Sequence, residues 1–219
     1  MSVTATRAKI FPYGPIEQGQ RVAVFGRAGS GKTYLTKWAI LKTQTVPWIV
    51  LDTKHDPNFD DWHPHDGLLT MDQLFRTWKE RRIVVVRPTP RQSIPEILDA
   101  YLSNLHESFD NIGVAIDETY QVAFGPKAGP GLTGLVTRGR VRKQTVIMGS
   151  QRPAWVPRFV FTEANGYAIM SLTLMADRKT VYDMTGKARV LNKVEPRHWL
   201  YYDVSGDTLR PFKPVTITT

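Results

Sequence analysis

The chain has 219 residues, a formal net charge of +9 and no cysteine. Its hydrophobic share of 42% and charged share of 22% exclude global disorder. The lack of cysteine excludes a disulfide scaffold, a thiol nucleophile, a cysteine-ligated zinc site and an iron–sulfur cluster. No apolar run is long enough to span a bilayer, and residues 1–9 lack the apolar core of a signal peptide, so we expect an intracellular protein.

Short apolar runs alternate with helical patterns along the first 150 residues. Strands are predicted at 21–25, 48–52, 83–87, 112–117 and 145–150. Helices are predicted at 32–42, after a capping box at 70–73, and after a second capping box at 93–96. A glycine-rich stretch at 125–134 leads into a predicted basic helix. This alternation predicts an α/β fold with a mainly parallel sheet and helices on both faces.

The pattern is looser beyond residue 157. The elements predicted there are a strand at 167–172, a short helix at 177–184, and a hairpin with strands at 199–204 and 208–213. We find no linker. We therefore interpret the chain as an amino-terminal arm (1–20), a core (21–160) and a carboxyl-terminal extension of the same domain with added strands (161–219).

The positive charge is concentrated in the last third of the chain. Residues 138–219 carry 14 basic and 6 acidic side chains, whereas residues 1–137 carry 15 and 14. A polyanionic partner for this part and a solvated basic surface without a ligand both explain the asymmetry.

Residues 26–33 match the phosphate-binding pattern G-x-x-x-x-G-K-[ST], between a predicted strand and a predicted helix. Glycines allow backbone N–H groups to surround a phosphate, and the start of the helix adds a positive dipole end. We expect Lys32 to contact the β and γ phosphates of ATP and the Thr33 hydroxyl to bind Mg²⁺. The predicted nucleotide-binding residues are Gly26, Gly29, Ser30, Gly31, Lys32 and Thr33. The alternative is a glycine turn without a nucleotide.

Two acidic residues end the predicted strand at 112–117. Asp117 is placed to hold the Mg²⁺ shell, and Glu118 to polarise an attacking water. An Asp-Glu pair here favours ATP hydrolysis that drives motion over phosphoryl transfer to a small molecule. A surface role for Glu118 is the alternative.

The last core strand ends in Gln151-Arg152-Pro153 and follows the basic run 137–143. An amide at this strand tip would lie beside the γ-phosphate, where Gln151 can report its presence. A solvated helix face is the alternative for the basic run.

The segment from Gly139-Arg140 to Gln151-Arg152-Pro153 resembles the G-R…Q-R-P segment of the FtsK–HerA superfamily of DNA-pumping ATPases. Asp52-Thr53-Lys54 also resembles that superfamily's D-x-K signature. With the two motifs above, four ordered motifs match across residues 21–160. The resemblance implies a RecA-like P-loop NTPase core, a ring that is often hexameric, and an arginine finger offered to the neighbouring subunit. Arg140 matches that arginine, Arg138 is the second candidate, and Gln151 matches the sensor.

The size of the chain is similar to that of genome-packaging ATPases of tailless, membrane-containing double-stranded DNA viruses. That resemblance implies an ATP-driven motor for double-stranded DNA that is largely indifferent to sequence. It implies a capsid vertex or viral membrane as docking partner, and a location in the host cytoplasm or at the packaging vertex of the virion. The alternatives are a plasmid-transfer or chromosome-segregation motor, a helicase loader, and a small-molecule kinase with an arginine-rich lid.

Three further features carry weaker expectations. Trp155 is interpreted either as a DNA contact or as an aromatic packed beside a turn. Residues 11–15 are expected to dock on the core or on a neighbouring subunit. A His/Asp-rich segment is interpreted as a polar surface loop, with a divalent metal site as the alternative; its members are His55, Asp56, Asp60, Asp61, His63, His65 and Asp66.

Overall fold

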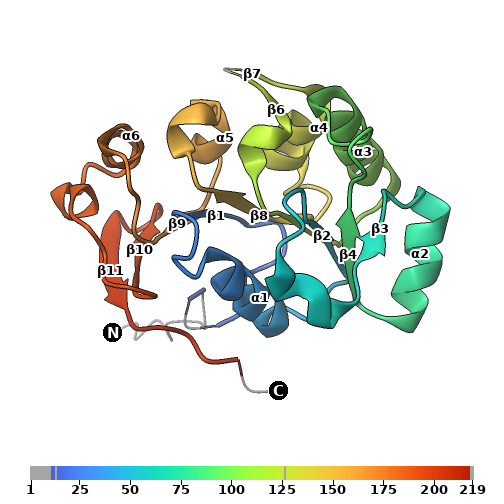
Figure 1. The fold of residues 1–219 in the computed structure, drawn as a ribbon, viewed down its shortest axis with the longest axis horizontal. Coiled ribbons are helices and arrows are strands. Elements are labelled where there is room, and N and C mark those ends of the chain that lie inside the picture. Colours follow the sequence, from blue (N-terminus) through green and yellow to red (C-terminus); the bar gives the residue numbers. More distant parts are fainter. Residues whose placement is uncertain (1–10, 13, 126, 218–219) are drawn as a thin grey trace, which may run out of the picture.

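The computed structural model describes residues 11–12, 14–125 and 127–217, and it is built on one nine-stranded sheet (Figure 1). The strand order is β11-β10-β9-β1-β8-β5-β2-β4-β3. These strands are β1 (Arg21–Phe25), β2 (Trp48–Leu51), β3 (His65–Asp66), β4 (Ile83–Arg87), β5 (Gly113–Ile116), β8 (Thr145–Ser150), β9 (Gly166–Ile169), β10 (Trp199–Asp203) and β11 (Thr208–Phe212). All neighbours from β9 to β3 pair in parallel, so the predicted α/β class is confirmed.

Helices and short helical turns connect the strands. The α-helices are α1 (Lys32–Lys42), α2 (Met71–Glu80), α3 (Pro95–Ser108), α4 (Pro130–Thr133), α5 (Arg158–Thr162) and α6 (Met175–Thr185). The 3₁₀ turns are η1 (Pro57–Trp62), η2 (Thr119–Gln121), η4 (Pro153–Trp155) and η5 (Ala188–Leu191), and η3 (Gly134–Arg138) is a π-helical turn. A small separate hairpin consists of β6 (Ala123–Phe124) and β7 (Lys127–Ala128).

Side chains alternate between two apolar layers along each central strand, as strand geometry requires. In β1, Ala23 and Phe25 face the larger layer, whereas Val22 and Val24 face the smaller one. The larger layer includes apolar residues from α2, α3, α4, η3, α5 and α6. The smaller layer includes residues from α1, η1 and the segment before β1. Figure 1 shows α3, α4, α5 and α6 on one side of the sheet and α1 on the other.

The order of the central strands determines what the sheet brings together. Strand β8 lies between β1 and β5 and pairs in parallel with both. The carboxyl ends of these three strands therefore lie side by side at one edge of the sheet. The phosphate-binding loop, Gln151 and the Asp117-Glu118 pair follow these three ends directly, so they meet at this edge.

The predicted hairpin after residue 198 is present and extends the sheet. Strand β10 pairs antiparallel with β9, and β11 pairs antiparallel with β10. Of the amino-terminal arm, residues 1–10 and 13 lie outside the described residues. Phe11 is buried against Trp38, Trp199 and Tyr201, so this part of the arm packs on its own core.

The capping box predicted at 70–73 is present, but the one predicted at 93–96 is wrong. Thr70 and Gln73 exchange both capping hydrogen bonds at the start of α2. Helix α3 instead begins at Pro95 with Ile94 as its cap, and the Ser93 hydroxyl donates backwards to Thr89. The residue before a proline is disfavoured in the helical conformation, so Ile94 stays extended and the helix starts one residue later than predicted.

The predicted basic helix before β8 is also wrong in its extent. Helical structure ends at Arg138, and residues 139–143 form successive turns. Gly139 has no room for a Cβ, which would lie 2.3 Å from the Leu135 carbonyl oxygen. Its carbonyl oxygen accepts the Gln144 N–H at 2.8 Å, which turns the chain into β8. Arg138 therefore ends the helical segment, whereas Arg140 and Arg142 lie on turns.

Across the described residues, no helix has both the length and the hydropathy needed to cross a bilayer.

We expect Gly113→Ala to destabilise the fold. An added Cβ would lie 2.2 Å from the ring of Trp48, a fully buried residue of the neighbouring strand β2. Overpacking of this kind costs about 1–3 kcal/mol, which should lower the Tm by roughly 2–12 °C. Thermal unfolding measures the change. Gly206→Ala, in the turn between β10 and β11, is the control, and an equal Tm for the two variants would contradict the packing argument.

Candidate functional site

The loop between β1 and α1 forms a glycine cradle. Gly29 and Gly31 adopt positive φ angles of 70° and 99°, a conformation that residues with a Cβ rarely adopt. A Cβ on Gly29 would meet nothing within 4 Å, so this backbone faces open space. Gly26 has no such freedom, because a Cβ there would lie 2.3 Å from the Ser30 hydroxyl. The glycines therefore provide both the curvature and the close packing of the loop.

A cleft of about 520 Å³ opens over this cradle. The predicted site residues that line it are Gly29, Gly31, Lys32, Thr33 and Gln151. The other lining residues are Arg27, Ala28, Tyr34, Asp56, Asn58, Met170, Arg197, Trp199, Pro214 and Val215. The cleft thus has a polar end at the cradle and a more apolar end near the last strands.

Lys32 reaches across the sheet edge to the end of β5. Its Nζ lies 2.8 Å from Asp117 Oδ1 and 2.9 Å from the Asp117 carbonyl oxygen. Both side chains are buried, so each ion compensates the other. Gly149 of β8 permits this approach, because a Cβ there would lie 2.3 Å from the Asp117 carbonyl oxygen.

The Thr33 hydroxyl donates to Asp56 Oδ2 at 2.6 Å. Partial burial raises the pKa of Asp56, but hydrogen bonds from Thr33 and Asn58 and the charge of Lys32 outweigh it and hold the pKa below its usual range. Asp56 is therefore a carboxylate at neutral pH. Thr33 and Asp56 bring together hydroxyl and carboxylate oxygens, the donors that suit magnesium, and Lys32 interacts with both Asp56 and Asp117.

Glu118 is fully buried and held by two contacts. Its Oε2 lies 2.6 Å from Lys54 Nζ, and its Oε1 accepts the backbone N–H of Gln151 at 2.8 Å. Gln151, which is predicted to sense the γ-phosphate, is therefore hydrogen-bonded through its backbone to the predicted general base. The Lys54 side chain is 26% exposed, so the only charge that neutralises Glu118 among the described ion pairs lies close to solvent.

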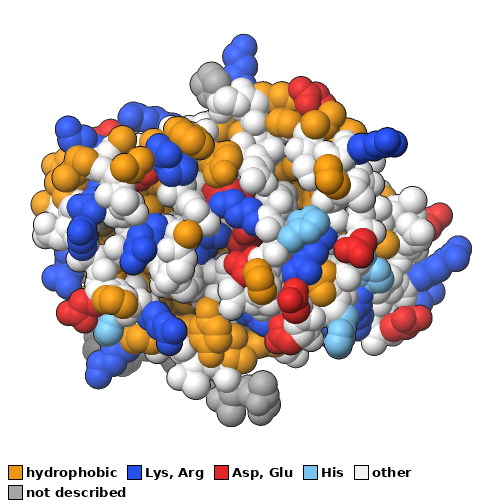
Figure 2. Space-filling model, viewed as in Figure 1, with side chains coloured by type: hydrophobic (Ala, Val, Ile, Leu, Met, Phe, Trp, Pro, Cys, Tyr) orange, Lys and Arg blue, Asp and Glu red, His pale blue; other side chains and the backbone are white. Residues whose placement is uncertain are grey.

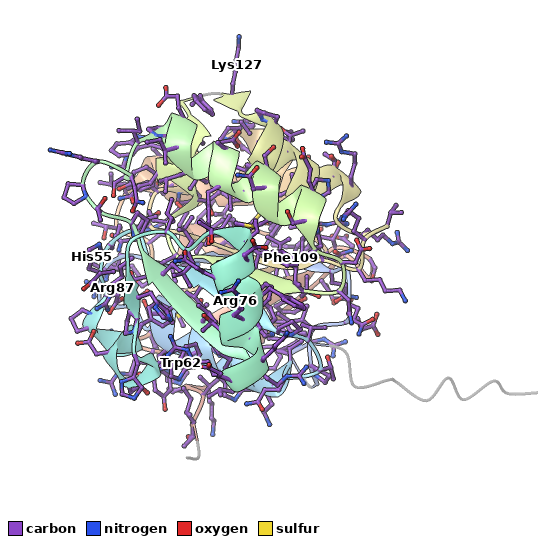
Figure 3. All side chains as sticks on the ribbon, turned by 90° about the vertical axis from the view of Figure 1, so that its right-hand side faces the viewer. His55, Trp62, Arg76, Arg87, Phe109 and Lys127 are labelled. Atoms are coloured by element: carbon purple, nitrogen blue, oxygen red, sulfur yellow. The ribbon has the colours of Figure 1, made fainter. Side chains whose placement is uncertain are left out.

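Basic residues hold the His/Asp-rich segment against the site. Arg87 pairs with both Asp52 and Asp60 at 2.8 Å, and Lys37 pairs with Asp61 at 2.5 Å. Figure 3 shows Arg87 beside His55 at one edge of the molecule. Within the described residues, no three His, Asp or Glu side chains gather as a metal site. The segment includes Asp56, whose carboxylate accepts the hydrogen bond from the Thr33 hydroxyl.

The two predicted finger arginines do not lie at this site. Both Arg138 and Arg140 are exposed, and Arg140 packs against Gly19, which precedes β1. The phosphate-binding loop follows the other end of β1, and five residues at about 3.3 Å each separate the two ends by roughly 16 Å. The structure thus brings together Lys32, Thr33, Asp117, Glu118 and Gln151, and it places both arginines at the opposite edge of the sheet.

Sequence reasoning missed three parts of the site. Asp56 was predicted only as one member of a His/Asp-rich segment, interpreted as a polar surface loop or a divalent metal site, and the Lys54–Glu118 ion pair was not predicted. The Lys54–Glu118 pair arises because the segments after β2 and β5 leave neighbouring parallel strands at the same edge of the sheet. The third part is the chain end, where Pro214 and Val215 line the cleft and the Ile217 N–H donates to the Tyr34 hydroxyl at 2.9 Å. No local pattern signals that contact.

Comparison with known proteins agrees with this geometry. The sequence matches no known protein-family profile. Among solved structures, the genome packaging NTPase B204 of Sulfolobus turreted icosahedral virus 2, in complex with sulfate, superposes with a TM-score of 0.71 at 19% identity, over 92% of this chain and 99% of that one. VirB4 of Thermoanaerobacter pseudethanolicus superposes with a TM-score of 0.67 at 9% identity, over 93% and 97%. At these identities, the two likenesses show a shared fold.

A sequence relative carries the argument further. The DNA packaging ATPase P9 of Enterobacteria phage PRD1 is 30% identical over 210 residues, which cover 90% of this chain and 87% of P9. A match of this identity along nearly the whole chain reflects common descent. The chain belongs to the family of viral DNA packaging ATPases that includes P9 of PRD1.

Proposed function

We propose that this protein is the ATP-driven motor that moves double-stranded DNA into a viral capsid. The observation that carries the proposal is the pair of buried carboxylates, Asp117 and Glu118, held by two lysines across from a glycine cradle. The chain is an ATPase, and B204 has been solved with the ATP analogue AMPPCP. That complex superposes with a TM-score of 0.70 at 20% identity, over 90% of this chain and 99% of B204.

The residues around the cradle suit ATP with Mg²⁺. The γ-phosphate would draw Lys32 away from Asp117, because a phosphate carries more charge than one carboxylate. Asp117, Thr33 and Asp56 would then hold the metal ion through their oxygen atoms. The magnesium ion supplies charge neutralisation across the phosphates.

Glu118 is the proposed general base. Its carboxylate orients the attacking water and accepts the water proton. Gln151 lines the cleft over the glycine cradle, and its backbone N–H donates to Glu118. A change at Gln151 on γ-phosphate binding would therefore also reach the general base.

Arg140 is the proposed arginine finger, with Arg138 as the second candidate. Neither can reach the cleft of its own chain from the opposite edge of the sheet, but both are exposed and available to a neighbour. We therefore propose a homo-oligomeric ring, hexameric as in the superfamily that the motifs resemble. The ring would dock at a capsid vertex or viral membrane, at the packaging vertex or in the host cytoplasm.

We expect Lys32→Ala to abolish ATP hydrolysis and to weaken nucleotide binding at least tenfold, because the variant loses the charge aimed at the β and γ phosphates. Phosphate release and nucleotide titration measure both effects. Lys42→Ala, at the exposed end of the same helix, is the matched control. Unchanged nucleotide affinity in a Lys32→Ala protein that melts normally would refute the phosphate-binding role.

We expect Glu118→Gln to bind ATP as the wild type does but to lose about 10²–10⁴-fold in turnover. The amide keeps an oxygen for the Gln151 N–H, yet it cannot accept a proton from water. Single-turnover hydrolysis separates this effect from nucleotide binding. Near-normal turnover would move the general base elsewhere, with Asp117 as the first candidate.

We expect Arg140→Ala to bind ATP normally and to lose about 10³–10⁵-fold in turnover. Mixing it with Glu118→Gln subunits should restore part of the activity, since some interfaces then combine an intact base with an intact finger. Ordinary turnover in Arg140→Ala would shift the role to Arg138. Mixed rings that form without any recovery would contradict a finger that acts in trans and would leave Arg140 a role within its own subunit, such as holding the local structure in place.

A further inference from the structure

A shallow groove of about 530 Å³ lies at the carboxyl edge of the sheet, beside the cleft for the nucleotide but separate from it. Its lining residues are Gly125, Ala154, Trp155, Val156, Pro157 and Arg158, and we call it the Trp155 groove. One wall comes from the hairpin that follows β5, and the other from the segment that follows β8. Glu118 and Gln151 follow directly after these two strands, so both walls begin beside the proposed catalytic residues.

The groove is basic and carries an exposed aromatic side chain. Trp155 is 53% exposed, and the Arg152 guanidinium lies 4.0 Å above its ring. The Arg158 side chain is 70% exposed, and Lys127 is exposed near the end of the hairpin. Figure 3 shows Lys127 extending away from the body of the molecule, and Figure 2 shows basic and hydrophobic side chains intermixed over α5 and α6.

Two aspartates pair with the two arginines, and with Lys127 the basic side chains outnumber these acidic ones. Asp183 pairs with Arg158 at 3.2 Å on the surface, and Asp177 pairs with Arg152 at 3.0 Å. The Asp177 side chain is buried, so it fixes Arg152 over Trp155 and presents little negative charge to solvent. Residues 138–219, which include most of the groove, also carry a net positive charge. A polyanion is therefore the complementary partner.

A line of contacts joins the groove to Glu118. Trp155 packs edge-on against Tyr120, with ring centroids 5.4 Å apart. Lys54 Nζ lies 5.8 Å from the centroid of the Tyr120 ring, within the range of a cation–π contact. The same Nζ is 2.6 Å from Glu118 Oε2. Movement of Trp155 would thus shift Tyr120, and with it the lysine that holds the buried carboxylate.

Resting on the proposed function, we propose that the Trp155 groove binds the phosphate backbone of duplex DNA and that Tyr120 and Lys54 transmit this contact to Glu118. Arg158 and Lys127 contact phosphates, and Trp155 packs against the sugar-phosphate surface. Lys54 is a positioning residue: it sets the orientation of Glu118 and does not touch the nucleotide in this arrangement.

Affinity for a short labelled duplex, measured by fluorescence anisotropy at several salt concentrations, tests the groove. Trp155→Ala should weaken binding roughly five- to tenfold, and Arg158→Gln should lower the salt slope by about one phosphate contact. Phe75→Ala and Arg76→Gln on α2 are matched controls. Phe75 is 52% exposed under Lys79, whose Nζ lies 4.7 Å from the ring centroid. Helix α2 lies at the β3 end of the sheet, away from the groove, which follows the central strands β5 and β8 (Figure 1).

The ratio of ATP turnover with and without saturating duplex tests the transmission. Tyr120→Leu should keep duplex affinity but bring this ratio close to one, because it removes the ring face under Lys54. Tyr120→Phe keeps that face and should keep the ratio. A merely structural role for Tyr120 would change the Tm and leave the ratio as in the wild type.

Three results would overturn these claims separately. Wild-type protein that neither binds duplex nor responds to it would overturn the proposed function. Wild-type protein that binds duplex, with unchanged affinity in folded Trp155→Ala and Arg158→Gln, would overturn the groove alone. Loss of ring assembly in those variants, seen by sedimentation, with affinity per subunit retained, would make the groove a subunit interface instead.

Discussion

Two adjacent carboxylates are buried at the end of one central strand, and the site is organised around the need to neutralise them. A buried carboxylate without a partner is costly, so Asp117 and Glu118 each require a cation. Lys32 comes from the glycine loop and Lys54 from the segment after β2, on opposite sides of β5. The two ion pairs hold the loop and the β2 end in place before any nucleotide arrives.

We propose that this arrangement makes the site responsive in two ways. A nucleotide competes with Asp117 for Lys32, whereas the groove acts on Glu118 through Lys54. The two signals meet at Glu118, where the backbone N–H of Gln151 is also bonded. The proposed finger arginines lie at the opposite edge of the sheet, so under this proposal one subunit alone holds an incomplete catalytic centre. Under this proposal, ring assembly, nucleotide binding and DNA contact are all conditions for ATP hydrolysis.

Much of the fold could be predicted from the sequence because its signals are local. Alternating apolar runs fix the strands, and the glycine motif fixes the turn between β1 and α1. The predictions failed where a neighbouring residue or a contact distant in sequence decides the structure. Pro95 moved the start of α3, and the chain turns at Gly139, whose carbonyl oxygen accepts the Gln144 N–H before β8. Asp56, Lys54 and Val215 reach the site through the strand order and the path of the chain end, which no single segment reveals.

The central claim is that ATP hydrolysis moves this protein along duplex DNA. Displacement of a third strand from a triplex on linear duplex DNA measures such movement directly. The account predicts release of the third strand with ATP, no release with Glu118→Gln, and release that is indifferent to the duplex sequence and weaker at high salt. ATP hydrolysis that is stimulated by the duplex while the third strand stays bound would contradict it.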